Sequence, residues 1–96
     1  MVFAWAEPSR LPAGGGDSQI LVRVKKRAGG APLAGVEVRF QASEGDLYSQ
    51  GKVLLTDVRG MTRDRVRTRH TTTITLNAGG TLSRVLVNVG EPSGSD

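Results

Sequence analysis

Arginine occupies every second position in the stretch TRDRVRTR, which covers residues 62–69. The four guanidinium groups belong to Arg63, Arg65, Arg67 and Arg69. Alternate residues of a β-strand point to one face, so this row would extend over roughly 20 Å. A guanidinium group is a planar fork of donors that suits phosphate, sulfate and carboxylate groups. The spacing therefore predicts a basic face for an anion. Charge runs are usually only solvated, however, and we favour that simpler interpretation.

The other reactive side chains are too few or too scattered for a catalytic or metal site. His70 is the single histidine, and the chain has no cysteine with which it could share a metal. Glu44, Asp46 and Asp57 could contribute to a calcium site but lack the dense spacing of calcium ligands; Asp57 should cap its own turn instead. The sequence has no nucleophile elbow, phosphate-binding loop or acid–base constellation. We expect no enzyme, no cofactor and no metal.

Composition places the chain among small globular domains. Its 96 residues are enough for one modest core, and 38% of them are hydrophobic. Only four residues are aromatic, so the core must be mostly aliphatic, which suits strands. The net charge of +4 permits anionic partners without requiring them.

The chain contains no apolar run near the ~20 residues of a membrane helix. Its beginning also lacks the residue order of a secretory signal. These features leave two interpretations, a cytoplasmic protein or one module of a longer chain. The strand-like beginning and the EPSGSD ending favour the module.

Apolar and polar residues alternate with a period of two, most clearly where Val36, Val38 and Phe40 alternate with Glu37 and Arg39. This pattern is typical of a half-buried strand. We predict about seven such strands, at residues 2–7, 18–27, 36–42, 52–56, 62–69, 71–78 and 81–89. Glycine-rich turns at roughly ten-residue spacing indicate an all-β sandwich. No segment has a helical apolar period with caps, so we expect no helix.

The order of four segments resembles the bacterial immunoglobulin-like domains of the invasin and intimin type. These segments are AEPSRLPAGGGDSQILVRV, GAPLAGVEVRFQASEGDL, TDVRG and TTTITLNAGGTLSRVLVNV, which together cover nearly the whole chain. The resemblance implies an immunoglobulin-like β-sandwich with Greek-key topology. Such domains usually stand in tandem and extend adhesins and other surface proteins away from the cell.

Two segments depart from that family's pattern. The stretch MTRDRVRTRH stands where members usually carry small apolar residues, and RAGG stands in a turn that often contains aspartate. The transthyretin-like or carboxypeptidase-regulatory sandwich shares the PLAGVEV strand and the TD-x-x-G turn. The long AGGGDS segment favours the invasin and intimin type.

In an immunoglobulin-like sandwich the second and fifth strands are antiparallel neighbours. The second strand should present Arg23, Lys25 and Arg27 on its polar face. Joined to the four arginines above, they would place seven cations on one sheet face with no acid between them on those two strands. Like charges side by side cost stability, so a bound polyanion or neighbouring acids would relieve this face. Salt-sensitive binding to lipopolysaccharide, an acidic glycan or nucleic acid would follow.

Two further positions need a structural explanation. Alternation points Asp64 inward, where a carboxylate must be hydrogen-bonded or paired; we expect an arginine or a backbone N–H as its partner. The family resemblance would leave Phe3 and Trp5 outside, whereas their size favours burial, and we favour burial. If exposed, they would lie beside the second strand's cations, suited to stacking on a sugar or base or to packing against a neighbouring module.

We predict one immunoglobulin-like domain at residues 1–90 and a linker or tail at 91–96. By resemblance, it would act as a rigid structural or adhesive module of a bacterial cell-surface or secreted protein, monomeric when isolated. Its partners would be neighbouring domains of a longer chain. The alternative function is binding of an anionic glycan or other polyanion. Among polyanions, we do not expect nucleic acid.

Overall fold

The alternating segments form strands in a computed structural model that describes residues 1–90, so the linker or tail expected at 91–96 lies outside the described residues. The seven expected strands are present, with two further two-residue strands, β2 and β5. The strands are β1 (Val2–Glu7), β2 (Arg10–Leu11), β3 (Gly16–Val24), β4 (Glu37–Ala42), β5 (Asp46–Leu47), β6 (Leu54–Leu55), β7 (Met61–Thr68), β8 (Thr72–Ala78) and β9 (Thr81–Val89). Residues 1–90 contain no helix, and hence no helix that could cross a membrane.

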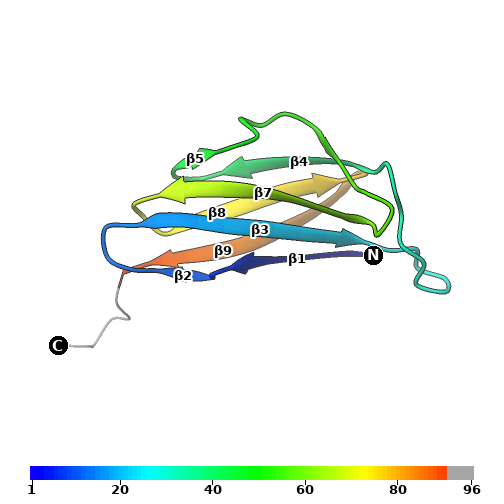
Figure 1. Ribbon diagram of the computed structural model, residues 1–96, viewed down its shortest axis with the longest axis horizontal. Helices are drawn as coiled ribbons and strands as arrows, with labels where there is room; N and C mark the ends of the chain where they lie inside the picture. Colours follow the sequence, from blue (N-terminus) through cyan, green and yellow to red (C-terminus); the bar gives the residue numbers. More distant parts are fainter. Residues whose placement is uncertain (91–96) are drawn as a thin grey trace.

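The strands form two layers (Figure 1). One sheet has four strands in the order β1-β3-β7-β5, and the other has five in the order β2-β9-β8-β4-β6. Neighbouring strands are antiparallel, except that β2 and β9 are parallel. The chain crosses between the sheets repeatedly from β3 to β7, as in an immunoglobulin-like sandwich.

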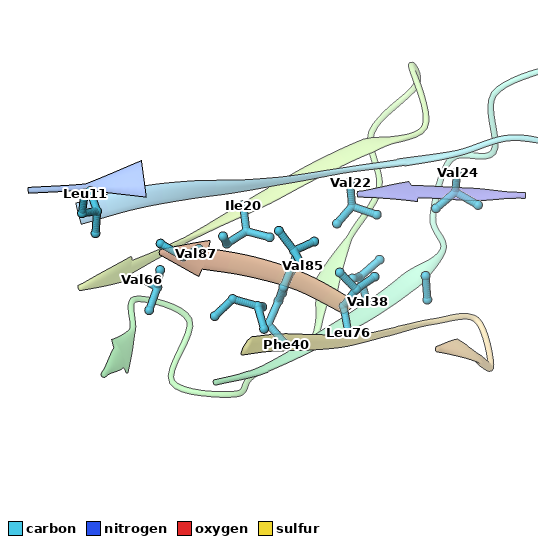
Figure 2. Packing of buried hydrophobic residues seen from close by; sticks show 12 residues of the cluster. Leu11, Ile20, Val22, Val24, Val38, Phe40, Val66, Leu76, Val85 and Val87 are labelled. Carbon is cyan, nitrogen blue, oxygen red and sulfur yellow. The ribbon is translucent and has the colours of Figure 1, made fainter. Parts of the chain in front are cut away.

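The core is a thin aliphatic layer between the sheets (Figure 2). Phe40 of β4 is the one aromatic residue among the buried hydrophobic side chains of the described chain. Each fully buried large side chain contributes about 1.5–3 kcal/mol. The buried hydrophobic residues are Leu11, Ile20, Val22, Val24, Val38, Phe40, Val66, Ile74, Leu76, Ala78, Val85 and Val87.

The sandwich is elongated, with extents of 48 × 26 × 18 Å. The N-terminus lies toward one end of the long axis, while β9 finishes at the other end (Figure 1). The strands run along this axis, so the first and last strands carry the chain from one end of the domain to the other.

The TDVRG turn fastens several segments together. The Thr56 hydroxyl donates to the carbonyl of Leu33 at 2.6 Å and accepts the N–H of Val36 at 2.9 Å. Oδ1 of Asp57 accepts the N–H groups of Arg59 at 2.8 Å and Met61 at 3.0 Å. These bonds confirm that Asp57 caps its own turn, in the manner of aspartate in turns generally.

Gly60 ends this turn at a φ of 74°, as expected of a left-handed residue. A Cβ at Gly60 would lie 2.4 Å from the carbonyl oxygen of Val24. Both the conformation and the contact therefore require glycine.

The turn also predicts a pH effect on stability. Hydrogen bonds from the N–H groups of Met61 and Arg59 lower the pKa of Asp57 below its ordinary value of 3.8. A carboxyl whose pKa is lowered by folding stabilises the protein above its unfolded pKa, and this contribution is lost as the pH falls through the folded pKa. We therefore expect the stability advantage of the natural chain over Asp57→Asn to shrink on acidification from about pH 5 to pH 2, measured by urea unfolding. A difference that stays constant over this range would contradict the prediction.

A second close approach lies at the opposite end of the sandwich. Gly15 and Gly45 both lie against the backbone around Thr68, where β7 ends. A Cβ on Gly15 would lie 2.0 Å from the Thr68 carbonyl oxygen, and one on Gly45 would lie 2.5 Å from that of Arg67. Three loops can therefore meet here only because two of them lack side chains at the contact.

Replacing Gly15 by alanine should destabilise the domain more than replacing its neighbour Gly14. Both residues have positive φ, at 88° and 95°, so the backbone strain is similar. A Cβ at Gly14 meets nothing within 4 Å, whereas one at Gly15 collides with backbone. We expect Gly15→Ala to lose about 1–3 kcal/mol more than Gly14→Ala in urea unfolding. Equal losses would show that the collision relaxes without cost.

Candidate functional site

The basic row lies on the outer face of the four-stranded sheet. β3 and β7 are antiparallel neighbours, as predicted for the second and fifth long strands. Arg63 lies opposite Leu21, and Arg65 lies opposite Gln19. Arg63, Arg65 and Arg67 are all exposed and alternate with buried residues of β7. The alternation along this strand is therefore confirmed.

Acidic residues flank the Arg67 end of the row, contrary to expectation. β3 begins at Gly16, so Asp17 is part of the strand and lies opposite Arg67. Nε of Arg67 is 3.6 Å from Oδ1 of Asp17. Asp46 of β5 lies opposite Arg67 on its other side. The prediction that no acid lies between the cations is wrong, because the glycine-rich segment enters the sheet earlier than residue 18.

The strand ends remove two cations from the predicted row. β3 ends at Val24, so Arg27 lies in the following turn. β7 ends at Thr68, and Arg69 lies in the bend beyond it. Lys25 stays at the sheet through an isolated bridge to Pro32. Of the seven predicted cations, the remaining five are Arg23, Lys25, Arg63, Arg65 and Arg67.

The first strand turns its aromatic residues outward. Val2, Ala4 and Ala6 pack against the core, while Phe3 is 45% exposed and Trp5 is half-buried. Our preference for burial of the two rings is therefore wrong. β1 is the edge strand of its sheet and also packs against β9, where small side chains fill the space.

Phe3 lies among cations, as expected for that register, whereas Trp5 contacts an acidic side chain. Phe3 is directly opposite Arg23, and Nζ of Lys25 is 5.9 Å from the centre of the Phe3 ring. Trp5 lies opposite Leu21 and donates from Nε1 to a carboxylate oxygen of Glu7 at 3.1 Å. The arrangement gives the sheet face cation–π contacts and partly exposed apolar surface.

Arg23 lies on the middle strand of this face, near the end of the sheet where β7 begins. Its Nη2 is 3.9 Å from the sulfur of Met61, the residue opposite it on β7. Its Nε is buried and has no hydrogen-bond partner within the described residues. A buried donor without an acceptor is uncommon, and the flanking Phe3 and Met61 restrict the side chain.

Tyr48 adds a third outward ring at the far side of the sheet. Leu47 packs against the core, whereas Tyr48 is 58% exposed. Its ring lies 5.3 Å from the guanidinium carbon of Arg65. Its hydroxyl donates to Asp17 at 3.4 Å. Tyr48 therefore shields Arg65 and ties it to the acidic end of the face.

Asp64 has a structural role. It is buried, and its Oδ1 accepts the N–H groups of Ser49 at 3.0 Å and Arg65 at 2.7 Å. The Ser49 hydroxyl donates to its second oxygen. These contacts confirm a backbone N–H as its partner, and they hold the connection between β5 and β6 onto β7.

The remaining candidate residues do not form a metal centre. His70 and Arg69 line a hollow at the glycine-rich end of the sandwich, together with Asp46 and Arg67. Asp57 is bound within its own turn. Over residues 1–90, no three His, Cys, Asp or Glu side chains gather closely enough to hold a metal ion.

Sequence reasoning missed Leu21 and Met61, which complete the apolar part of the outer face. Leu21 was detectable, because it is an apolar residue at a position where alternation expects a polar one. Met61 stands at the first position of β7, outside the range predicted for that strand. Its place opposite Arg23 depends on the strand register, which alternation alone does not specify.

The acidic residue beside Arg67 predicts how the face responds to a polyanion. Asp17 neutralises Arg67, so Asp17→Asn should free that guanidinium group. We expect the variant to elute from immobilised heparin at a higher salt concentration than the natural chain. The slope of log affinity against log salt should steepen by about one counterion. Unchanged elution would show that Arg67 is not held by Asp17 in solution.

No protein-family model matches the chain. A search of curated proteins finds no match either. Solved structures are similar over nearly its whole length. Invasin, described as a bacterial integrin-binding protein, matches 95% of this chain at 22% identity with a TM-score of 0.80. The adhesin InvE of Yersinia pseudotuberculosis matches 92% at 18% identity with a TM-score of 0.71.

A third similar structure is the C-terminal 282-residue fragment of intimin in complex with the intimin-binding domain of its translocated receptor, Tir. It matches 91% of this chain at 18% identity with a TM-score of 0.70. The chain spans 19% of the invasin chain, 26% of the InvE chain and 31% of the intimin fragment. These likenesses confirm the predicted fold, an immunoglobulin-like β-sandwich of the invasin and intimin type.

Proposed function

We propose that this immunoglobulin-like domain is a non-catalytic structural and adhesive module of a bacterial cell-surface or secreted protein. The supporting observation is the placement of its ends. The chain begins toward one end of a 48 Å long body, and β9 finishes at the other. Neighbouring domains joined in this way are held apart by the length of the sandwich.

The fold supports the same role by analogy. Invasin is an integrin-binding protein, InvE is an adhesin, and the intimin fragment is bound to part of its receptor. A shared fold does not carry a shared ligand, because function depends on sites. We therefore propose that this chain spaces and presents neighbouring domains. We do not transfer the ligands of those three proteins to it.

Binding of an anionic glycan is the weaker alternative. Asp17 and Asp46 flank Arg67, and Arg27 and Arg69 lie beyond the strand ends. The remaining cations share their face with partly exposed apolar side chains. A polyanion would find only part of the continuous row that the sequence suggests.

Surface display can be tested with a single introduced cysteine, since the chain has none. Ala28 lies exposed in the turn after β3, whereas Ile20 is fully buried in the core. In the parent protein made by its own cells, Ala28→Cys should react with a membrane-impermeant maleimide on intact bacteria. Ile20→Cys should react only after denaturation.

The unsubstituted parent protein gives the background labelling from any cysteine elsewhere. If Ala28→Cys is labelled only after the cells are broken, a surface location is excluded. Labelling in the culture medium alone would indicate a secreted protein, which the proposal includes.

A further inference from the structure

Six residues form a continuous patch on the outer face of the four-stranded sheet. Strand register places them in two rows across β1, β3 and β7. One row is Phe3, Arg23 and Met61, and the next is Trp5, Leu21 and Arg63. We call these six residues the outer patch. The outer patch lies on a regular sheet surface. A domain that only separates its neighbours does not require such a patch.

The outer patch brings four apolar or aromatic side chains together at the surface. Phe3 is 45% exposed, and Trp5, Leu21 and Met61 are each only partly buried. Single exposed hydrophobic residues are ordinary, but contiguous ones rimmed by polar groups mark interaction sites. Tryptophan and arginine are also the residue types that dominate binding energy at protein interfaces.

Within residues 1–90, the charged side chains of the outer patch have no acidic partner. Among residues 1–90 the one ion pair joins Arg67 to Asp17, outside the patch. Arg63 faces Leu21, and Arg23 faces Phe3 on one side and Met61 on the other. Carboxylates of a partner would complement these two guanidinium groups, and apolar surface would complement the other four side chains.

This combination discriminates among the classes of partner. A small ligand prefers a concave site, whereas the patch lies across three hydrogen-bonded strands. A second copy would bring the same arginines into opposition, and like charges disfavour such contacts. A sulfated glycan would satisfy the arginines but leave Leu21 and Met61 without apolar partners. A protein segment that carries both acidic and apolar side chains satisfies every part.

We propose that the outer patch binds an acidic protein segment. Apolar side chains of that segment pack on Phe3, Trp5, Leu21 and Met61, while its carboxylates meet Arg23 and Arg63. The contact of Arg23 with Met61 restricts the guanidinium group before binding, which lowers the entropic cost of the interaction. The proposal goes beyond the spacing role and holds whether or not the domain separates its neighbours.

Trp5 is the single tryptophan of the chain, so it reports binding at the patch directly. The natural 96-residue chain is titrated with a soluble synthetic peptide that combines glutamates and phenylalanines. We expect a saturable change in Trp5 fluorescence and protection from iodide quenching. The same peptide with glutamine at every glutamate should bind at least about tenfold more weakly, the equivalent of 1.4 kcal/mol. A heparin-derived oligosaccharide should leave Trp5 unprotected.

Two pairs of exposed residues provide matched variants. Arg63→Ala should weaken peptide binding about five- to tenfold, while Arg84→Ala, on β9 of the other sheet, should not change it. Phe3→Thr should weaken binding similarly, while Leu86→Thr on β9 should not. All four side chains are exposed, and circular dichroism confirms that each variant is folded.

Several outcomes would overturn the proposal. One is an unchanged Trp5 signal with the acidic peptide, and another is equal binding of the glutamine peptide. Tighter binding of the heparin oligosaccharide would assign the face to a glycan. Equal losses of peptide affinity for Arg63→Ala and Arg84→Ala would show that the peptide responds only to the net charge of the domain. None of these results bears on the cysteine-labelling test, so the two proposals fail independently.

Discussion

Burial of aliphatic side chains between two sheets is the constraint on which the rest of this structure depends. The layer is thin, and Phe40 is its one buried aromatic residue within the described chain. Each long strand gives alternate residues to this layer, which leaves the other half free to face solvent. The arginine row of β7 and the aromatic residues of β1 occupy such free positions. The outer surface is therefore a direct consequence of how the core is filled.

Buried hydroxyl groups hold the connections between the two sheets. Thr72 donates to the carbonyl of Glu44 at 2.8 Å and accepts its N–H at 2.9 Å. At the TDVRG turn, the Thr56 hydroxyl likewise donates to a backbone carbonyl, that of Leu33. Ser18 donates to the carbonyl of Pro8 at 2.6 Å. A buried polar group is tolerated when its hydrogen bonds are made. These residues supply hydrogen-bond partners to backbone groups of the loops that cross between the sheets.

The long strands could be predicted from alternation, because one face of each is buried and the other faces solvent. β2 and β5 were not predicted, and β6 is shorter than its predicted range of 52–56, because so short a strand is defined by backbone pairing and not by a repeated pattern. The site was harder for the same reason. Asp17 is part of β3, although the glycine run before it is typical of a loop. Arg27 and Arg69 lie beyond the ends of their strands. Phe3 and Trp5 were misplaced because size says nothing about the room available at a sheet edge.

The parallel pairing of β2 with β9 gives the domain a particular response to tension. A pull on its two ends draws β1 and β9 along their own axes in opposite directions. Hydrogen bonds from β1 to β3, from β9 to β8 and between β2 and β9 lie across the direction of this pull, which loads them in shear. Resistance to stretching follows the rate at which this whole set breaks, and not the equilibrium free energy of unfolding.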